Sequence, residues 1–144
     1  MNPREGGAYR LELARRPLLM AEENLKPDFW PSAVANAQLV VENAAKAICA
    51  CFGPVPKTHD TAEVLQLLTG TELPREIVGQ IEAVIPIARE YGRKKHIQAT
   101  YGEEEAFLTP WAIFGEKEAR QAVEDARRCL AVATGVYEHF FGQG

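Results

Sequence analysis

The feature that most constrains this chain is the spacing of its apolar residues between positions 31 and 52. Apolar side chains recur there every three or four residues, which places them on one face of an α-helix. Alanine fills much of the remainder, favours helix and lets neighbouring helices approach closely. The sequence therefore predicts a long, buried helix whose core-facing stripe consists of Val34, Ala37, Val41, Ala44, Ile48 and Cys51.

Three further stretches, at about 8–25, 74–91 and 116–141, show the same period, and a shorter helix is expected over 60–68. Because a proline removes a backbone donor, we expect a kink or break near Arg16, before Pro17, and a kink at Pro86. Residues 92–115 show no period and are expected to be irregular. No segment alternates apolar and polar residues as a strand does. The predicted fold is all-α, an antiparallel four-helix bundle with an extra short helix between the second and third long helices.

The composition is that of one globular domain, here residues 1–144, with 47% hydrophobic and 25% charged residues. A net charge of −4 argues against binding nucleic acid with the whole surface. No apolar run is long enough to span a bilayer, and the sequence begins without an apolar signal segment. The three cysteines suit reduced thiols on helical stripes. We expect a cytoplasmic protein with no metal and no cofactor.

Residues 89–96, called the basic cluster below, stand out from this acidic background. They hold four basic residues and one acidic residue, a net +3, so the other 136 residues carry −7. Such a cluster attracts phosphates. His96 carries an imidazole, a side chain that can exchange a proton at cellular pH, and Arg89 can hold a phosphate through two donors, so the pair can support RNA cleavage without a metal. The alternative is a solvated basic helix end favoured by the helix dipole.

Several segments resemble the HEPN domain family. The run 33–47, with Gln38, Glu42 and Lys46, resembles the family's second-helix signature. Residues 57–60, Lys-Thr-His-Asp, and the apolar positions after them are similar to its Thr-His-Asp segment and short helix. The basic cluster falls where the family has its arginine-rich motif, and 116–130 resembles its terminal helix. The resemblance covers about residues 8–140.

The resemblance implies a four-helix up-and-down bundle, often a homodimer and often encoded beside a minimal nucleotidyltransferase, as in a toxin–antitoxin pair. Many members are metal-independent ribonucleases with an Arg, four to six residues and a His; Arg89 and His96 match with six. One branch has a tyrosine shortly after the histidine, whereas here Tyr101 lies five residues on. Another branch has Arg-Tyr-Pro, lacks the histidine and is linked to nucleotide binding; residues 89–92 partly match it.

Three functional hypotheses follow. The first is a non-catalytic nucleotide- or RNA-binding module, and the second is a ribonuclease that uses Arg89 and His96. The third is a structural dimeric adaptor. For dimerisation, an apolar C-terminal end at Tyr137, Phe140 and Phe141 is the expected contributor. The residues expected to contact a nucleotide or RNA are Arg89, Arg93, Lys94, Lys95 and Tyr101.

Overall fold

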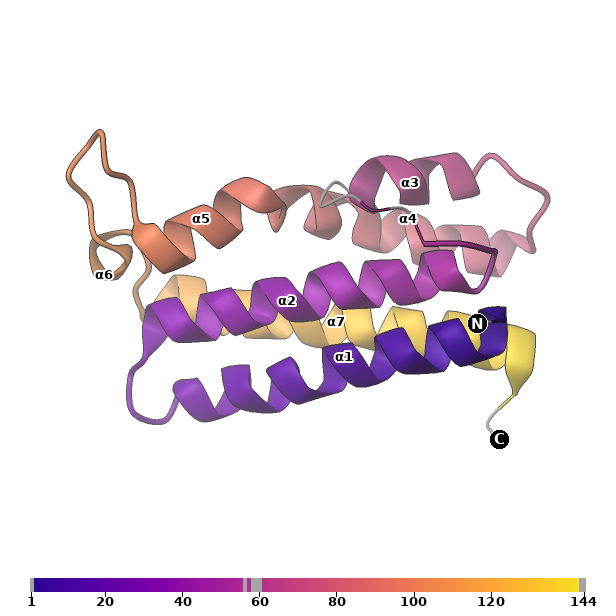
Figure 1. Ribbon diagram of the computed structural model, residues 1–144, viewed down its shortest axis with the longest axis horizontal. Helices are drawn as coiled ribbons and strands as arrows, with labels where there is room; N and C mark the ends of the chain where they lie inside the picture. Colours follow the sequence, from indigo (N-terminus) through magenta and orange to yellow (C-terminus); the bar gives the residue numbers. More distant parts are fainter. Residues whose placement is uncertain (1, 56, 58–60, 143–144) are drawn as a thin grey trace.

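The structure is a computed structural model that describes residues 2–55, 57 and 61–142. Within these residues the chain forms seven α-helices and no named strand (Figure 1). The helices are α1 (Pro3–Asn24), α2 (Trp30–Ala50), α3 (Thr61–Leu68), α4 (Arg75–Glu90), α5 (Arg93–Tyr101), α6 (Pro110–Ile113) and α7 (Glu116–Phe141).

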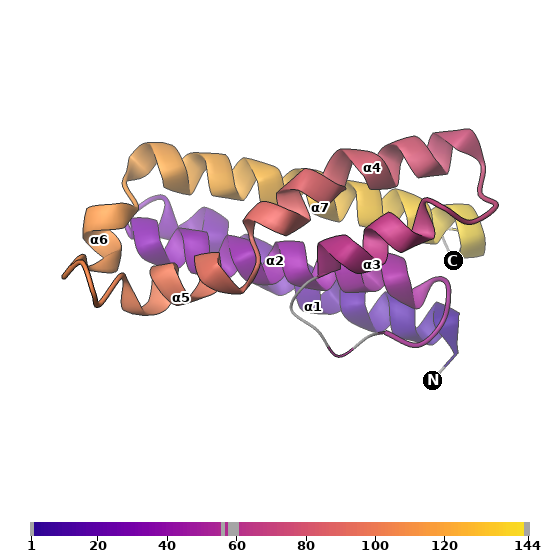
Figure 2. The same cartoon turned by 90° about the horizontal axis from the view of Figure 1, so that it is seen from above.

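The helices form the predicted up-and-down bundle. Three long helices, α1, α2 and α7, run side by side along the molecule (Figures 1 and 2). The fourth position is shared by α4 and α5, which follow one another along the axis, with α3 beside α4 (Figure 2). No helix in the described part of the chain is long and apolar enough to cross a membrane.

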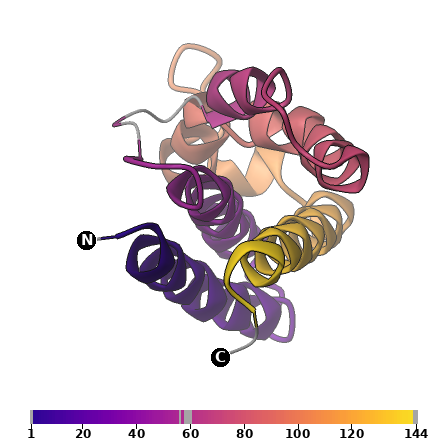
Figure 3. The ribbon, with the colours of Figure 1, turned by 90° about the vertical axis from the view of Figure 1, so that its right-hand side faces the viewer.

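The centre of the bundle is α2. In the end view it lies between α1 on one side and the α3–α4 layer on the other (Figure 3). Every residue of its predicted stripe is buried. Lys46 and Glu42, four residues apart on α2, form an ion pair, with Nζ 3.6 Å from Oε2. The apolar period of this segment thus predicted both the helix and its buried face.

Of the kink or break predicted near Arg16, the break is wrong, because α1 is one helix that contains Pro17. It also begins at Pro3, earlier than predicted, since the Asn2 side chain accepts a hydrogen bond from the Glu5 N–H at 2.8 Å and caps the helix. Pro17 leaves the Leu13 carbonyl without its usual partner, and Leu13 is exposed enough for water to replace it. Pro86 likewise lies inside the single helix α4.

The irregular segment predicted for 92–115 is also wrong, because it contains α5 and α6. Among the described side chains of α5, Ala99 is the buried one. A helix that buries so little has no apolar stripe, so its period does not show in the sequence. The predicted start of α3 at Asp60 lies outside the described residues, as do Thr58 and His59.

The last helix, α7, has the predicted bounds. Its apolar residues Ala119 and Val123 are buried, as are Cys129 and Val136 in the later turns, whereas Phe140 near the end is 38% exposed.

Candidate functional site

The basic cluster spans a break between two helices. After α4 ends at Glu90, Tyr91 and Gly92 redirect the chain before α5 starts. Tyr91 is 4% exposed, and its hydroxyl donates a hydrogen bond to Asp125 Oδ2 of α7 at 2.8 Å. Burial raises the pKa of Tyr91 well above its ordinary value, and the bond to Asp125 adds to this. Tyr91 therefore stays neutral and fixes the junction to α7.

Helix geometry separates the basic side chains that are adjacent in sequence. Successive helical residues point about 100° apart, so Lys94, Lys95 and His96 lie on three sides of α5. Lys95 turns inward: its Nζ is 5.3 Å from the Tyr91 ring centroid and 3.7 Å from Glu90 Oε1. Cation–π attraction and this ion pair hold Lys95 at 22% side-chain exposure.

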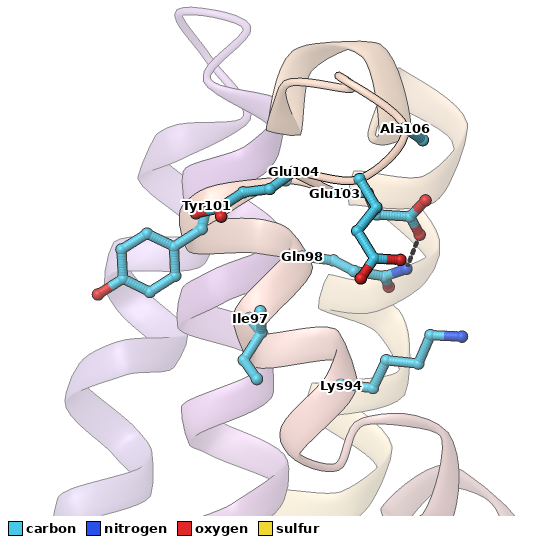
Figure 4. Close-up of a pocket in the computed structure, with 9 residues that line it drawn as sticks. Lys94, Ile97, Gln98, Tyr101, Glu103, Glu104 and Ala106 are labelled. Carbon is cyan, nitrogen blue, oxygen red and sulfur yellow. Dashed lines mark hydrogen bonds between the residues drawn. The ribbon is translucent and has the colours of Figure 1, made fainter.

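Lys94 lies on the opposite side and lines a pocket. Lys94, Ile97, Gln98 and Tyr101 are spaced three and four apart and share one face of α5. Residues 102–106 complete a pocket of about 810 Å³ against this face. Figure 4 shows Tyr101 and Lys94 pointing to different sides of the pocket. The structure therefore places two predicted contact residues, Lys94 and Tyr101, along one pocket.

Arg89 and His96 belong to separate elements. Arg89 is in the last turn of α4, and its Nη2 lies 3.8 Å from Glu63 Oε1 of α3. His96 is in the first turn of α5 and is exposed. Within the described residues, no hydrogen bond or ion pair joins the two side chains. The side chain of Arg93 lies outside the described part of the structure.

The pocket beside α5 is acidic as well as basic. Its lining includes the carboxylates of Glu103, Glu104 and Glu105. Gln98 Nε2 donates to Glu103 Oε1 at 2.6 Å, which ties the loop to the helix. The sequence analysis did not include these glutamates in a site, because a run of like charges usually marks a solvated loop. Three carboxylates repel phosphate, so the pocket interior does not suit it.

The start of α5, unlike the acidic pocket, favours an anion. An α-helix leaves its first backbone N–H groups without partners inside the helix. Gly92, the residue before α5, has no side chain to accept from them, and none of the described side chains caps the helix. The helix dipole adds partial positive charge at this point, and Lys94 and His96 flank it. This end of α5 can therefore hold an anion.

A smaller hollow of about 300 Å³ lies on the side of Lys95, between α5 and α7. Its lining adds Lys117 and Gln121, which the sequence analysis did not single out. No local signal links these residues to the basic cluster, because they are brought near it only by the packing of α7.

Comparison with known proteins gives one family and one fold neighbour. The model of the family described as HEPN domain matches residues 8–138. The chain is similar to the crystal structure of TT1696 from Thermus thermophilus, with 24% sequence identity and a TM-score of 0.66. That match covers 94% of this chain and 99% of the other, and at this identity it shows a shared fold. No curated protein sequence matches the chain significantly.

Proposed function

Since the chain belongs to the HEPN domain family, we propose that it is a non-catalytic module that binds the phosphates of a nucleotide or RNA at the start of α5. One observation carries this proposal: the start of α5, which no described side chain caps, has the exposed residues Lys94 and His96 in its first turn. Because the chain as a whole is acidic, its attraction for phosphate is concentrated at this place.

Two neighbouring basic residues extend the proposed contact. Arg89 is 57% exposed, and its pair with the exposed Glu63 is weak enough for a phosphate to replace it. Lys95 is held more firmly, and its ammonium adds positive potential. Arg93 is included in the proposed contact because of its position in the sequence, within the basic cluster. We leave Tyr101 out of the phosphate contact, because it is the last residue of α5 and the proposed contact is at the start of that helix.

The binding proposal is tested by titrating a fluorescent single-stranded RNA, and separately ATP, at several salt concentrations. The double variant Lys94→Ala with His96→Ala should weaken binding and flatten the salt dependence, by about 0.7 in the log–log slope for each lost phosphate contact with single-stranded RNA. Arg15→Ala removes a positive charge from the exposed face of α1 and serves as the control. An equal loss of binding in the double variant and in Arg15→Ala, or no loss in either variant, would place the site elsewhere.

Metal-independent RNA cleavage is a second proposal, favoured by the exposure of both Arg89 and His96. In it Arg89 holds the scissile phosphate and His96 transfers the proton. His96→Ala should then slow cleavage by roughly a hundredfold, and Arg89→Lys almost as much, since an ammonium lacks the planar two-donor fork. Products should carry 2′,3′-cyclic phosphate, and EDTA should have no effect. RNA left intact across the neutral pH range would contradict cleavage and leave the binding module.

We also propose that the protein forms a homodimer. The expected C-terminal contributors pack mostly within the protomer: Phe140 stacks edge-on against Phe52 at 5.2 Å, and Tyr137 against Phe141 at 5.0 Å. The outer face of α1 offers more exposed apolar surface, with Tyr9 at 51% and Met20 at 56%. Sedimentation equilibrium should show a dimer at micromolar concentration, and a monomer throughout would refute it.

A minimal nucleotidyltransferase is the proposed protein partner, on the basis of family membership. Co-expression and co-purification with a nucleotidyltransferase encoded beside this chain would test it. If the protein dimerises but binds neither nucleotide nor RNA, the structural adaptor hypothesis replaces the binding module.

A further inference from the structure

The end of the molecule formed by α5, α6 and the loop between them leaves large apolar side chains in solvent. Isolated exposed apolar residues are ordinary, but a group of them in one region indicates an interaction site. This group, here called the end surface, consists of Ile97 (41% exposed), Tyr101 (67%), Phe107 (94%), Leu108 (41%) and Trp111 (70%).

The loop that carries the end surface is held in a defined conformation. Glu103 and Leu108 exchange both backbone hydrogen bonds, at 2.8 and 3.0 Å, and the Phe107 N–H donates to the Glu104 carbonyl at 3.1 Å. Phe107 has a φ of +56°, in the left-handed region that aromatic residues rarely adopt. The loop thus holds Phe107 in a strained backbone conformation while its side chain stays in solvent. Burial of the side chain therefore does not offset the strain. Strain of this kind tends to occur where a side chain is presented to a ligand.

Two residues of the end surface line the 810 Å³ pocket between α5 and the loop. Ile97 and Tyr101 form part of its wall, and Ala106 lies across from α5 (Figure 4). This volume is in the range of sites that hold an apolar group of ligand size. One aromatic or aliphatic side chain from a partner fits within it.

The charge around the pocket selects the partner. Glu104 and Glu105 are exposed and make no ion pair with any described residue, while Lys94 is the one cation in the lining. Their carboxylates attract lysine and arginine and repel phosphate. The end surface therefore combines apolar contacts with a negative rim.

We propose that the end surface docks a basic segment of another protein. An aromatic or aliphatic side chain of that segment enters the pocket beside Ile97 and Tyr101. Lysine or arginine residues next to it in the partner pair with Glu104 and Glu105. This interaction has the opposite charge preference to phosphate binding at the start of α5, and Lys94 borders both sites.

A random peptide library displayed on phage, selected against the full chain, tests the chemistry of the partner. The selected peptides should share an aromatic or aliphatic residue flanked by lysine or arginine. A synthetic peptide of the selected sequence, titrated by fluorescence polarisation, should also shift the emission of Trp111 to shorter wavelength as its ring loses solvent. Peptides that are acidic, or that share no pattern, would overturn the proposal.

Three variants locate the binding of that synthetic peptide. Phe107→Ser with Trp111→Ser should weaken it roughly thirtyfold or more, as for lost aromatic anchors. Glu104→Gln with Glu105→Gln should weaken it roughly two- to tenfold and reduce its salt dependence. Leu67→Ser, a matched removal of an exposed apolar side chain on α3, should leave it unchanged.

Three results would assign the surface differently and overturn the proposal. One is an equal loss of peptide binding in Leu67→Ser. The second is a loss of RNA binding in the Phe107 and Trp111 variant, which would make this a nucleic-acid surface. The third is self-association that the glutamate substitutions abolish, which would make the occupant a second copy. Circular dichroism checks that each variant is folded. We expect each variant to fold, because all the replaced side chains are exposed.

Discussion

Replacing Ala44 by aspartate places a carboxylate at the centre of α2. Ala44 is completely buried, and its stripe neighbours Val41 and Ile48 are each 1% exposed. Because α2 is flanked by other helices on several sides (Figure 3), a two-bond side chain at this position has no route to water. The carboxylate is therefore introduced without solvent and without a designed partner.

The expected cost follows from three contributions. An uncompensated buried charge costs about 3–5 kcal/mol, and the added volume in a filled core costs about 1–3 kcal/mol more. The lower helix propensity of aspartate adds about 0.7 kcal/mol. The sum is comparable with the total stability of a domain, about 5–15 kcal/mol. Ala44→Asp should therefore leave the protein largely unfolded or close to it at neutral pH.

Guanidinium denaturation followed by far-ultraviolet circular dichroism measures this, with Ala131→Asp as the matched control. Ala131 is exposed on α7, so its substitution should cost only about the propensity difference, 0.7 kcal/mol. Burial raises the pKa of the new carboxyl in the folded state, so the gap between the variants should narrow as the pH falls and the group becomes neutral. Equal midpoints for Ala44→Asp and Ala131→Asp would refute the assignment of the buried face.

Three further predictions concern other parts of the fold. Tyr91→Phe removes the hydrogen bond to Asp125 and should lower the free energy of unfolding by about 0.5–1.5 kcal/mol, measured by the same denaturation; no change would mean that water replaces the bond fully. Gly102→Ala adds a methyl group against the Leu108 carbonyl at a φ of +75°, so it should distort the loop and increase cleavage there by protease, with the helical spectrum retained; wild-type resistance would contradict this. Burial raises the pKa of the three buried thiols from 9 to about 11 or 12. The folded protein should react slowly with a thiol reagent at pH 8, whereas rapid reaction would show that the thiols are accessible. Since the unfolded thiols ionise first, stability should fall as the pH rises from 9 toward 12.

Helices with a broad buried face were predictable, and those without one were not. The spacing of the apolar residues indicates the buried faces of α2 and α7, so the positions of these two helices followed from the sequence. The helix α5 has one buried residue among its described side chains, Ala99, and is held by contacts with distant elements, such as Lys95 with the Phe114 ring. Tertiary contacts of this kind leave no local period.

The location of the site was predictable from the sequence, but the relative positions of its side chains were not. The basic cluster was visible as a run of charge, but the separation of Lys94 from His96 depends on that run being helical. The relation of Arg89 to His96 depends on the turn at Tyr91, which is set by a hydrogen bond to Asp125, 34 residues further along the chain. Sequence spacing alone does not contain that contact.

The division of the fourth bundle position into α4 and α5 has a consequence for hydrogen exchange. Opening α5 exposes little apolar surface, because Ala99 is the buried residue among its described side chains, whereas opening α2 exposes the centre of the core. The amides of α5 should therefore exchange through inexpensive local opening, while those in the middle of α2 exchange only when the whole domain unfolds. A ligand at either end of α5 would then stabilise the least protected helix of the bundle, and its binding would be visible as slower exchange there before anywhere else.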